Sequence, residues 1–292
     1  LIRVAYNYYA KFPKDSLYAR CMYYMGFYYS LNDSLERANY CLKEAQRTAK
    51  VQKDTATLCL AMTRYSWVVR KTHPEAGLEY AKRVLGLYEK YSKRNVFNIV
   101  YNTLMVCECE NFCGNPRRAF SLAQQAEKNA LALGDSTVIS DVYQDMAYFA
   151  VSLGDKRSTH FALLSCRYSD TRFVSKRLML AKAYEKTGNY HECINLLDTL
   201  RLENNGQRYE AFAMRHRAAV KLNDPAALSY ADSAYHYIEA MFDDELCDKT
   251  IYFENLMQEK TERLRAEAWT VLYKGFCLGI LIFIFIGLLL IA

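Results

Sequence analysis

The segment LAKAYEKTGNYHECINLLDTL, residues 180–200, constrains the fold more than any other part of the chain. Ala181 and Tyr184 share one face of a first predicted helix, because residues three and four positions apart lie on the same side. Gly188 begins a Gly-Asn pair that is typical of a helix stop followed by a turn. Apolar residues then return at helical spacing, so the segment predicts two antiparallel helices. The face of the second helix consists of Tyr190, Cys193, Ile194 and Leu197.

This pattern closely resembles the consensus of the tetratricopeptide repeat (TPR), with Cys193 in place of its usual alanine. Small residues at Ala181 and Cys193 let the two helices approach, while Tyr184 and Leu197 fill the adjoining volume. The same template recovers five further copies, two of them degenerate. Their spacing of 32 to 46 residues predicts a diverged array with elongated helices. The small residues of the six first helices are Gly26, Ala61, Cys107, Ala147, Ala181 and Ala213.

The resemblance implies an all-α fold, a TPR-like right-handed α-solenoid of about six antiparallel helix pairs over residues 1–242. Composition agrees, because 4 Pro and 11 Gly are too few for an all-β chain and 52% hydrophobic residues suffice for a core. Some positions should pack the helices and repeats together. They are Gly26, Tyr29, Ala38, Cys107, Gly114, Ala119, Ala147, Gly154, Ala181, Tyr184, Gly188 and Tyr190.

Stacked repeats of this kind form a concave groove, and the resemblance implies that the first helix of each pair lines it and binds a protein or peptide. The alternative that several of these residues only pack against the next repeat stays open. The Lys and Asn clamp of repeats that bind chaperone C-termini is absent from these positions, which argues against that subclass. The predicted partner-binding residues are Tyr23, Phe27, Met62, Tyr65, Leu104, Glu108, Gln144, Tyr148, Lys182, Glu185 and Met214.

No catalytic or cofactor motif is visible, so we expect neither enzymatic activity nor a cofactor. Most of the ten cysteines have the helical spacing of small core residues, and the cluster Cys107, Cys109 and Cys113 lacks a CxxC spacing and a nearby histidine, which argues against zinc. The net charge of +6 is distributed as isolated basic doublets, which are typical of solvated helix faces. We therefore expect no nucleic-acid binding by this segment.

Residues 243–274 contain no Gly or Pro and predict one long helix with a broken heptad seam, either a short coiled coil or a helix packed on the last repeat. Residues 275–292 carry no charge and would span about 27 Å as a helix, near the thickness of a bilayer's hydrocarbon core. They predict a transmembrane helix. The spacing of Gly275 and Gly279 predicts a helix contact in the membrane and a homodimer through residues 243–292.

The N-terminal segment LIRVAYNYYAKFPKDSLYARCMYYMGFYYSLNDSLERANYCLKEA resembles a type of Gram-negative bacterial membrane protein. The resemblance implies a divergent TPR array on the outer side, one membrane helix, and a cytoplasmic coiled coil that often ends in a helix-turn-helix domain. It predicts a single-pass membrane localisation with periplasmic repeats. Because the chain starts at Leu1 and ends within the apolar run at Ala292, we expect it to be a fragment.

Two functional hypotheses follow. The first is a membrane-anchored TPR interaction module that forms the sensor or scaffold part of a bacterial signalling or transcription-regulatory protein. The second is a tail-anchored adaptor or assembly factor that holds a partner at the membrane without signalling. A coiled coil and a helix-turn-helix domain beyond Ala292 would favour the first hypothesis, and a stop codon soon after it would favour the second.

Overall fold

The computed structural model describes residues 2–9, 11–12, 14–31, 34–91, 95–169 and 173–242, together with Trp269 and Tyr273. The chain divides into two units, Leu1–Asp244 and Glu245–Ala292. Every regular element of the described residues is a helix.

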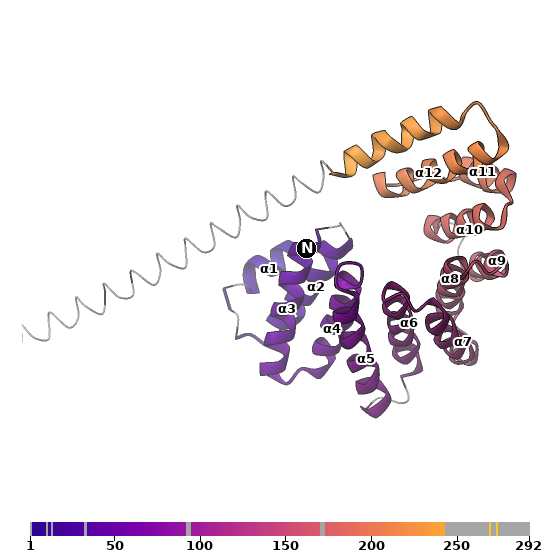
Figure 1. Cartoon of the computed structure of the whole chain (residues 1–292). Helices are drawn as coiled ribbons and strands as arrows, with labels where there is room; N and C mark the ends of the chain where they lie inside the picture. Colours follow the sequence, from indigo (N-terminus) through magenta and orange to yellow (C-terminus); the bar gives the residue numbers. More distant parts are fainter. Residues whose placement is uncertain are drawn as a thin grey trace, which may run out of the picture. The chain divides into compact units, whose positions relative to one another are not determined.

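The helices of the first unit follow one another in chain order in Figure 1. Residues 227–242 form a further helical segment after the last of them. The helices are α1 (Ile2–Tyr9), α2 (Tyr18–Leu31), α3 (Leu35–Gln52), α4 (Thr55–Val69), α5 (Pro74–Tyr91), α6 (Val96–Phe112), α7 (Pro116–Leu133), α8 (Ser136–Leu153), α9 (Ser158–Tyr168), α10 (Val174–Thr187), α11 (Tyr190–Asp198) and α12 (Asn205–Leu222).

The contacts between helices have the pattern of a solenoid. Each helix from α2 to α12 packs against the next one, and the even-numbered helices also contact one another in the order α2, α4, α6, α8, α10, α12. The helical segment 227–242 packs on α12, where the Phe212 ring lies 5.6 Å from the Tyr237 ring. The small first-helix residues expected from the repeat pattern, from Gly26 to Ala213, lie on these even-numbered helices.

Capping residues explain where several helices begin and end. Asp135 precedes α8, and its carboxylate accepts hydrogen bonds from the backbone N–H groups of Thr137 and Val138 at 2.8 and 3.1 Å. These bonds satisfy donors that the first turn of a helix leaves free. At the other end, Gly154 and Gly188 follow α8 and α10 with φ of +68° and +86°, a left-handed conformation that glycine adopts without steric cost.

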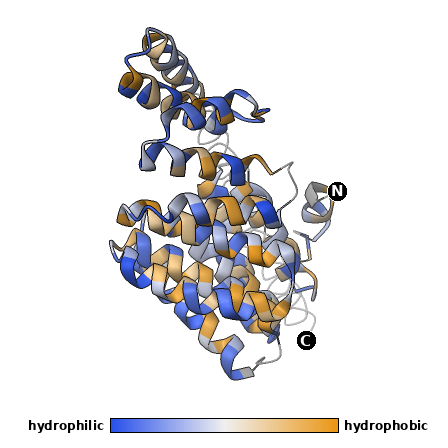
Figure 2. Ribbon diagram, turned by 90° about the vertical axis from the view of Figure 1, so that its right-hand side faces the viewer, coloured by the Kyte–Doolittle hydropathy of each residue, from blue (hydrophilic) through white to orange (hydrophobic). Residues whose placement is uncertain are grey.

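Helix packing relies on small residues at the places where helices cross. Gly26 on α2 faces Leu42 on α3, and a Cβ atom added to it would lie 2.6 Å from the Leu42 Cγ atom. Hydrophilic and hydrophobic residues alternate along the helices, as the hydropathy colouring in Figure 2 shows. Among the positions expected to pack the array, Ala38, Cys107, Ala119, Ala147 and Ala181 are fully buried and Gly26 is buried. Tyr29, Tyr184 and Tyr190 are half-buried. Gly114, Gly154 and Gly188 lie in turns with positive φ.

The cysteines behave as core residues in the described part of the chain. Cys21, Cys41, Cys59 and Cys193 are buried, Cys166 is half-buried, and none of them forms a disulfide there. Burial raises the pKa of Cys41 to about 12, so that its thiol stays protonated at neutral pH. Within the described ranges, no group of three or more His, Cys, Asp or Glu residues is arranged to hold a metal ion.

The predicted membrane localisation requires correction. No helix among the residues that the structure describes is both long enough and apolar enough to cross a bilayer. The single-pass localisation with periplasmic repeats is therefore wrong as a statement about the described helices. The segment on which the prediction depended, 275–292, lies outside the described residues, as do Gly275 and Gly279. The long helix predicted for 243–274 also lies outside them, except that Trp269 and Tyr273 are helical and exposed.

Candidate functional site

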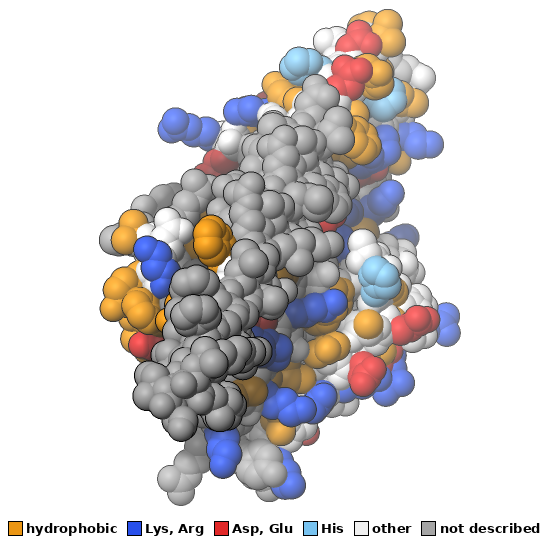
Figure 3. Space-filling model, turned by 90° about the vertical axis from the view of Figure 1, so that its left-hand side faces the viewer, with side chains coloured by type: hydrophobic (Ala, Val, Ile, Leu, Met, Phe, Trp, Pro, Cys, Tyr) orange, Lys and Arg blue, Asp and Glu red, His pale blue; other side chains and the backbone are white. Residues whose placement is uncertain are grey.

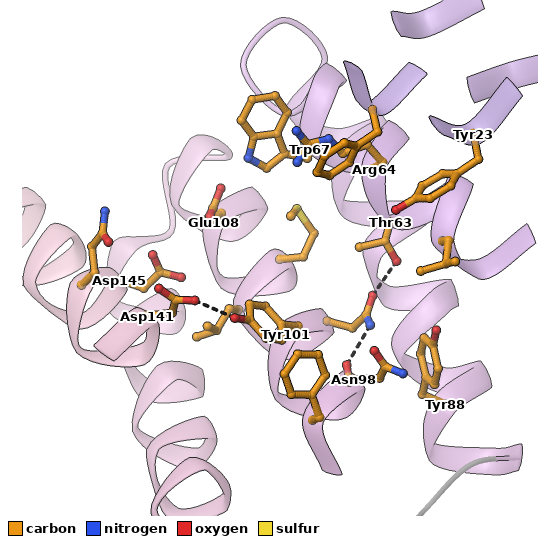
Figure 4. Close-up of a pocket in the computed structure, with 17 residues that line it drawn as sticks. Tyr23, Thr63, Arg64, Trp67, Tyr88, Asn98, Tyr101, Glu108, Asp141 and Asp145 are labelled. Carbon is orange, nitrogen blue, oxygen red and sulfur yellow. Dashed lines mark hydrogen bonds between the residues drawn. The ribbon is translucent and has the colours of Figure 1, made fainter. Parts of the chain in front are cut away.

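A cleft of about 540 Å³ opens on the even-numbered helices of the array. Its walls come from α2, α4, α6 and α8, with Tyr88 of α5 at one edge (Figure 4). Because these helices are successive neighbours, a ligand in the cleft would contact three or four repeats at once. The aromatic part of the wall consists of Tyr23, Phe27, Trp67, Tyr88, Phe97 and Tyr101.

Arg64 holds part of the aromatic wall in place. Its guanidinium carbon lies 4.3 Å from the ring centroids of both Phe27 and Trp67, and its Nε donates a hydrogen bond of 2.7 Å to the Ser30 hydroxyl. A cation between two aromatic faces is attracted by the negative potential above each ring. This stacking joins α2 to α4 and fixes the orientation of the Trp67 indole.

A second arginine covers Trp67 and pairs with an acid of the cleft. The Arg70 guanidinium carbon lies 4.2 Å from the Trp67 ring centroid, and Arg70 Nε lies 2.6 Å from Glu108 Oε2. Desolvation raises the pKa of the Glu108 carboxyl, although the neighbouring Arg70 opposes this change. The pair connects α4 to α6 and leaves little of the Glu108 charge uncompensated.

Asp141 links three consecutive first helices. Its carboxylate accepts a hydrogen bond of 2.7 Å from the Tyr101 hydroxyl of α6 and forms an ion pair with Lys176 of α10. The Lys176 side chain is only 7% exposed, so Asp141 is the counter-charge of a largely buried ammonium group. Burial and the hydrogen bond to Asp141 raise the pKa of the Tyr101 hydroxyl, which therefore remains a donor at physiological pH.

Asp145 differs from the other two acids of the cleft. It is half-buried beside Asp141, and within the described part of the chain its carboxylate has neither a hydrogen bond nor an ion pair. Desolvation raises the pKa of Asp145 well above its ordinary value, and the charges of Glu108 and Asp141 raise it further, while Lys176 and Arg70 oppose the change. The site therefore favours either a proton or a bound cation at Asp145.

Because its pKa is raised, Asp145 should destabilise the folded protein at neutral pH, and the neutral isostere asparagine should remove that loss. The folded state retains the Asp145 proton at pH values where the unfolded chain has lost it. The contribution of Asp145 to the free energy of unfolding is therefore highest at low pH and decreases as pH rises through the folded-state pKa of Asp145. Asp145→Asn should therefore raise the melting temperature at pH 7.5, and the gain should vanish near pH 4. Thermal melts across this range measure it, and an equal gain at both pH values would contradict the assignment.

Five of the residues predicted to bind a partner lie in the cleft wall, namely Tyr23, Phe27, Leu104, Glu108 and Gln144. Tyr148 and Lys182 lie together outside it, with the Lys182 ammonium 5.5 Å from the Tyr148 ring centroid. Three others are covered by packing, since Met62 is 3%, Tyr65 8% and Met214 0% exposed. Glu185 is buried and paired with Arg217 at 2.7 Å. Binding by any of these residues stays a prediction, and the four buried ones pack the array in this structure.

Sequence reasoning missed the residues that define the character of the cleft. Trp67 and Arg64 lie on α4, Tyr101 on α6, and Asp141 and Asp145 on α8. Asp141 stands three positions before the predicted Gln144, and Tyr101 three before Leu104, so each lies one helical turn from a residue that was found. Extending each predicted position by one turn would have recovered several of them.

No protein-family model and no curated protein sequence matches the chain. Among solved structures, a Rap protein complexed with Competence and Sporulation Factor has a TM-score of 0.58 at 16% identity, covering 80% of this chain and 77% of that one. Pseudomonas aeruginosa pilF has a TM-score of 0.48 at 14% identity, covering 81% and 97%. A signal transduction ATPase from Pyrococcus horikoshii with a TPR sensor has a TM-score of 0.49 at 16% identity, and the match covers 82% of this chain and 38% of that one.

The similarity to the Rap structure confirms the expected TPR-like α-solenoid. The right-handed superhelix remains a prediction.

On the face seen in Figure 3, Lys and Arg side chains are dispersed among acidic and hydrophobic ones.

Proposed function

We propose that the chain is a protein-interaction module whose cleft on α2, α4, α6 and α8 binds an extended peptide segment of its partner. The observation that carries this proposal is the aromatic wall, which places six large rings in one cleft of about 540 Å³. Aromatic side chains provide a large contact area with few rotatable bonds, and for this reason they dominate binding energetics. The Rap protein with the similar fold was solved with a bound factor, which is compatible with this use of the fold.

The arrangement of the cleft favours an extended ligand. Its wall runs across successive helices, and neighbouring helices stand about 8 to 10 Å apart. An extended chain advances about 3.3 Å per residue, so five or six residues would reach from α4 to α8. Polar side chains such as Asn98 and Gln144 also line the cleft and offer amide groups to the backbone of such a ligand.

We also propose that the module acts without catalysis. Two acids of the cleft, Glu108 and Asp141, are engaged by Arg70 and Lys176, which suits positioning better than proton transfer. A regulatory role is the finer proposal: a ligand that spans α4 to α8 would restrict how these repeats move relative to one another. An adaptor that only holds its partner is the second candidate, and it requires the same cleft without a change between the repeats.

A pair of matched phenylalanines tests the cleft. Phe97 lies in the cleft wall and is 44% exposed, whereas Phe173 lies outside it and is 52% exposed. Both substitutions to alanine should leave stability nearly unchanged. Peptides selected by the parent protein from a displayed random library should bind Phe97→Ala about tenfold more weakly and Phe173→Ala normally. Fluorescence polarisation with the selected peptides gives the two dissociation constants.

Two results would overturn the proposed function. The library could yield no enriched sequence against the parent protein, or the enriched peptides could bind Phe97→Ala and Phe173→Ala with equal affinity. The first result would show that the protein does not bind extended peptides, and the second would show that they bind elsewhere on the array. Circular dichroism of both variants serves as the control for folding.

A further inference from the structure

The two ends of the cleft differ in chemistry. The rings of Tyr23, Phe27 and Trp67 come from α2 and α4, and the acids Glu108, Asp141 and Asp145 come from α6 and α8. Figure 4 shows Asp141 and Asp145 side by side, across the cleft from the aromatic end. The cleft is thus lined mainly by aromatic rings, with Arg64 between two of them, at one end and by acids at the other.

The charges at the acidic end are only partly compensated. Glu108 pairs with Arg70, which follows α4, and Asp141 pairs with Lys176 of α10, so these two bases are already engaged, while Arg64 lies at the aromatic end of the cleft. Asp145 has no ion pair within the described residues, and the charges that face it come from α4, α6, α8 and α10. One unpaired carboxylate therefore remains beside a cleft large enough to admit a ligand.

We propose that the partner peptide carries a basic side chain, Lys or Arg, that binds the carboxylate of Asp145 while its apolar residues contact the rings on α2 and α4. The inference rests on the proposed function, because it names the class of peptide for the same cleft. A basic side chain supplies the positive counter-charge that the Asp145 carboxylate lacks. It forms a charge-assisted hydrogen bond with this half-buried carboxylate. A proton is the alternative occupant in the absence of ligand.

The geometry also fixes the spacing within the peptide. The helix α6 lies between α4 and α8, and contacts both. With about 8 to 10 Å per helix and about 3.3 Å per residue, the basic residue should stand about five positions from the apolar anchor. A folded partner surface would not thread this distance through the cleft as easily as an extended segment.

Acetylated and amidated hexapeptides test the inference, because their termini carry no charge. In the pool, Lys occupies each position in turn and the other five positions are drawn from Ala, Leu, Phe and Ser. A matched pool has norleucine in place of Lys. Affinity selection on the purified 292-residue chain in mild detergent, followed by mass spectrometry, should enrich Lys peptides. Their dissociation constants should be at least tenfold lower than those of the norleucine peptides.

Two variants assign the preference to its residue. Asp145→Asn should abolish the preference for Lys, so that Lys and norleucine peptides bind it with equal affinity, and Asp232→Asn, an exposed acid outside the cleft, should keep it. Equal binding of Lys and norleucine peptides to the parent, or a preference that survives in Asp145→Asn, would overturn the inference and leave the cleft as an apolar peptide site. Failure of both pools, together with failure of the random library, would overturn the proposed function as well.

Discussion

Asp141→Asn should destabilise the array by about 3 kcal/mol, because it leaves the buried Lys176 ammonium without its ion-pair partner. The substitution keeps the size of the side chain and an oxygen that accepts the hydrogen bond from Tyr101, so the lost charge is the main change. Lys176 is only 7% exposed, so water does little to replace the lost partner. Urea unfolding followed by circular dichroism measures the effect.

Removing the other partner should cost much less. Lys176→Met deletes the buried charge, and the Asp141 carboxylate left behind is 31% exposed and still accepts the Tyr101 hydrogen bond. The double variant should therefore recover most of the stability that Asp141→Asn loses, which gives a coupling energy of at least about 1 kcal/mol in a double-mutant cycle. Additive losses in the double variant would show that the two residues act independently and that the ion pair does not join α8 to α10.

Local sequence patterns were sufficient to predict the repeats. Gly188 and Asn189 mark a turn because a left-handed residue is needed there, and small residues such as Ala181 recur because two helices cross at that place. Both requirements act within one helix pair of the chain, so both leave a readable signal in the sequence. The TPR-like solenoid follows from repeating that pair.

The cleft depends on relations that no single repeat contains. Whether one turn of a first helix faces the cleft or the next repeat depends on the rotation between repeats, and Met62 and Tyr65 are buried for this reason while Arg64, between them in the sequence, lines the cleft. The ion pair between Asp141 and Lys176 joins residues 35 positions apart on different repeats. Helical periodicity predicts the shared face of one helix but not the partner across the gap.

Gly26→Leu should destabilise the protein by at least about 3 kcal/mol, because α2 and α3 cross at this residue with no room for a side chain. Even the first added atom, Cβ, would lie 2.6 Å from Leu42 Cγ and 3.3 Å from the Ala38 carbonyl oxygen. Leu42 is fully buried and the Ala38 contact involves backbone, so neither can withdraw without separating the helices. Thermal melts and urea titrations measure the loss.

Gly86 provides a matched control for this substitution. It lies in the helical part of α5, and a Cβ atom there would meet no atom within 4 Å. Gly86→Leu should stabilise the chain by roughly 0.5 to 1 kcal/mol, since it removes the flexibility of glycine from a helix. Opposite signs for the two substitutions would separate the effect of crowding at Gly26 from that of helix propensity, which favours leucine at both positions.

A compensating change locates the crowding at Leu42. Leu42→Ala alone should cost about 2 to 5 kcal/mol, because it opens a cavity between α2 and α3. Combined with Gly26→Leu, the new side chain at position 26 can occupy the space that Leu42 leaves, so the double variant should be more stable than the sum of the two losses implies. Strict additivity would mean that the helices cross elsewhere, and the alignment of this first repeat would then be wrong.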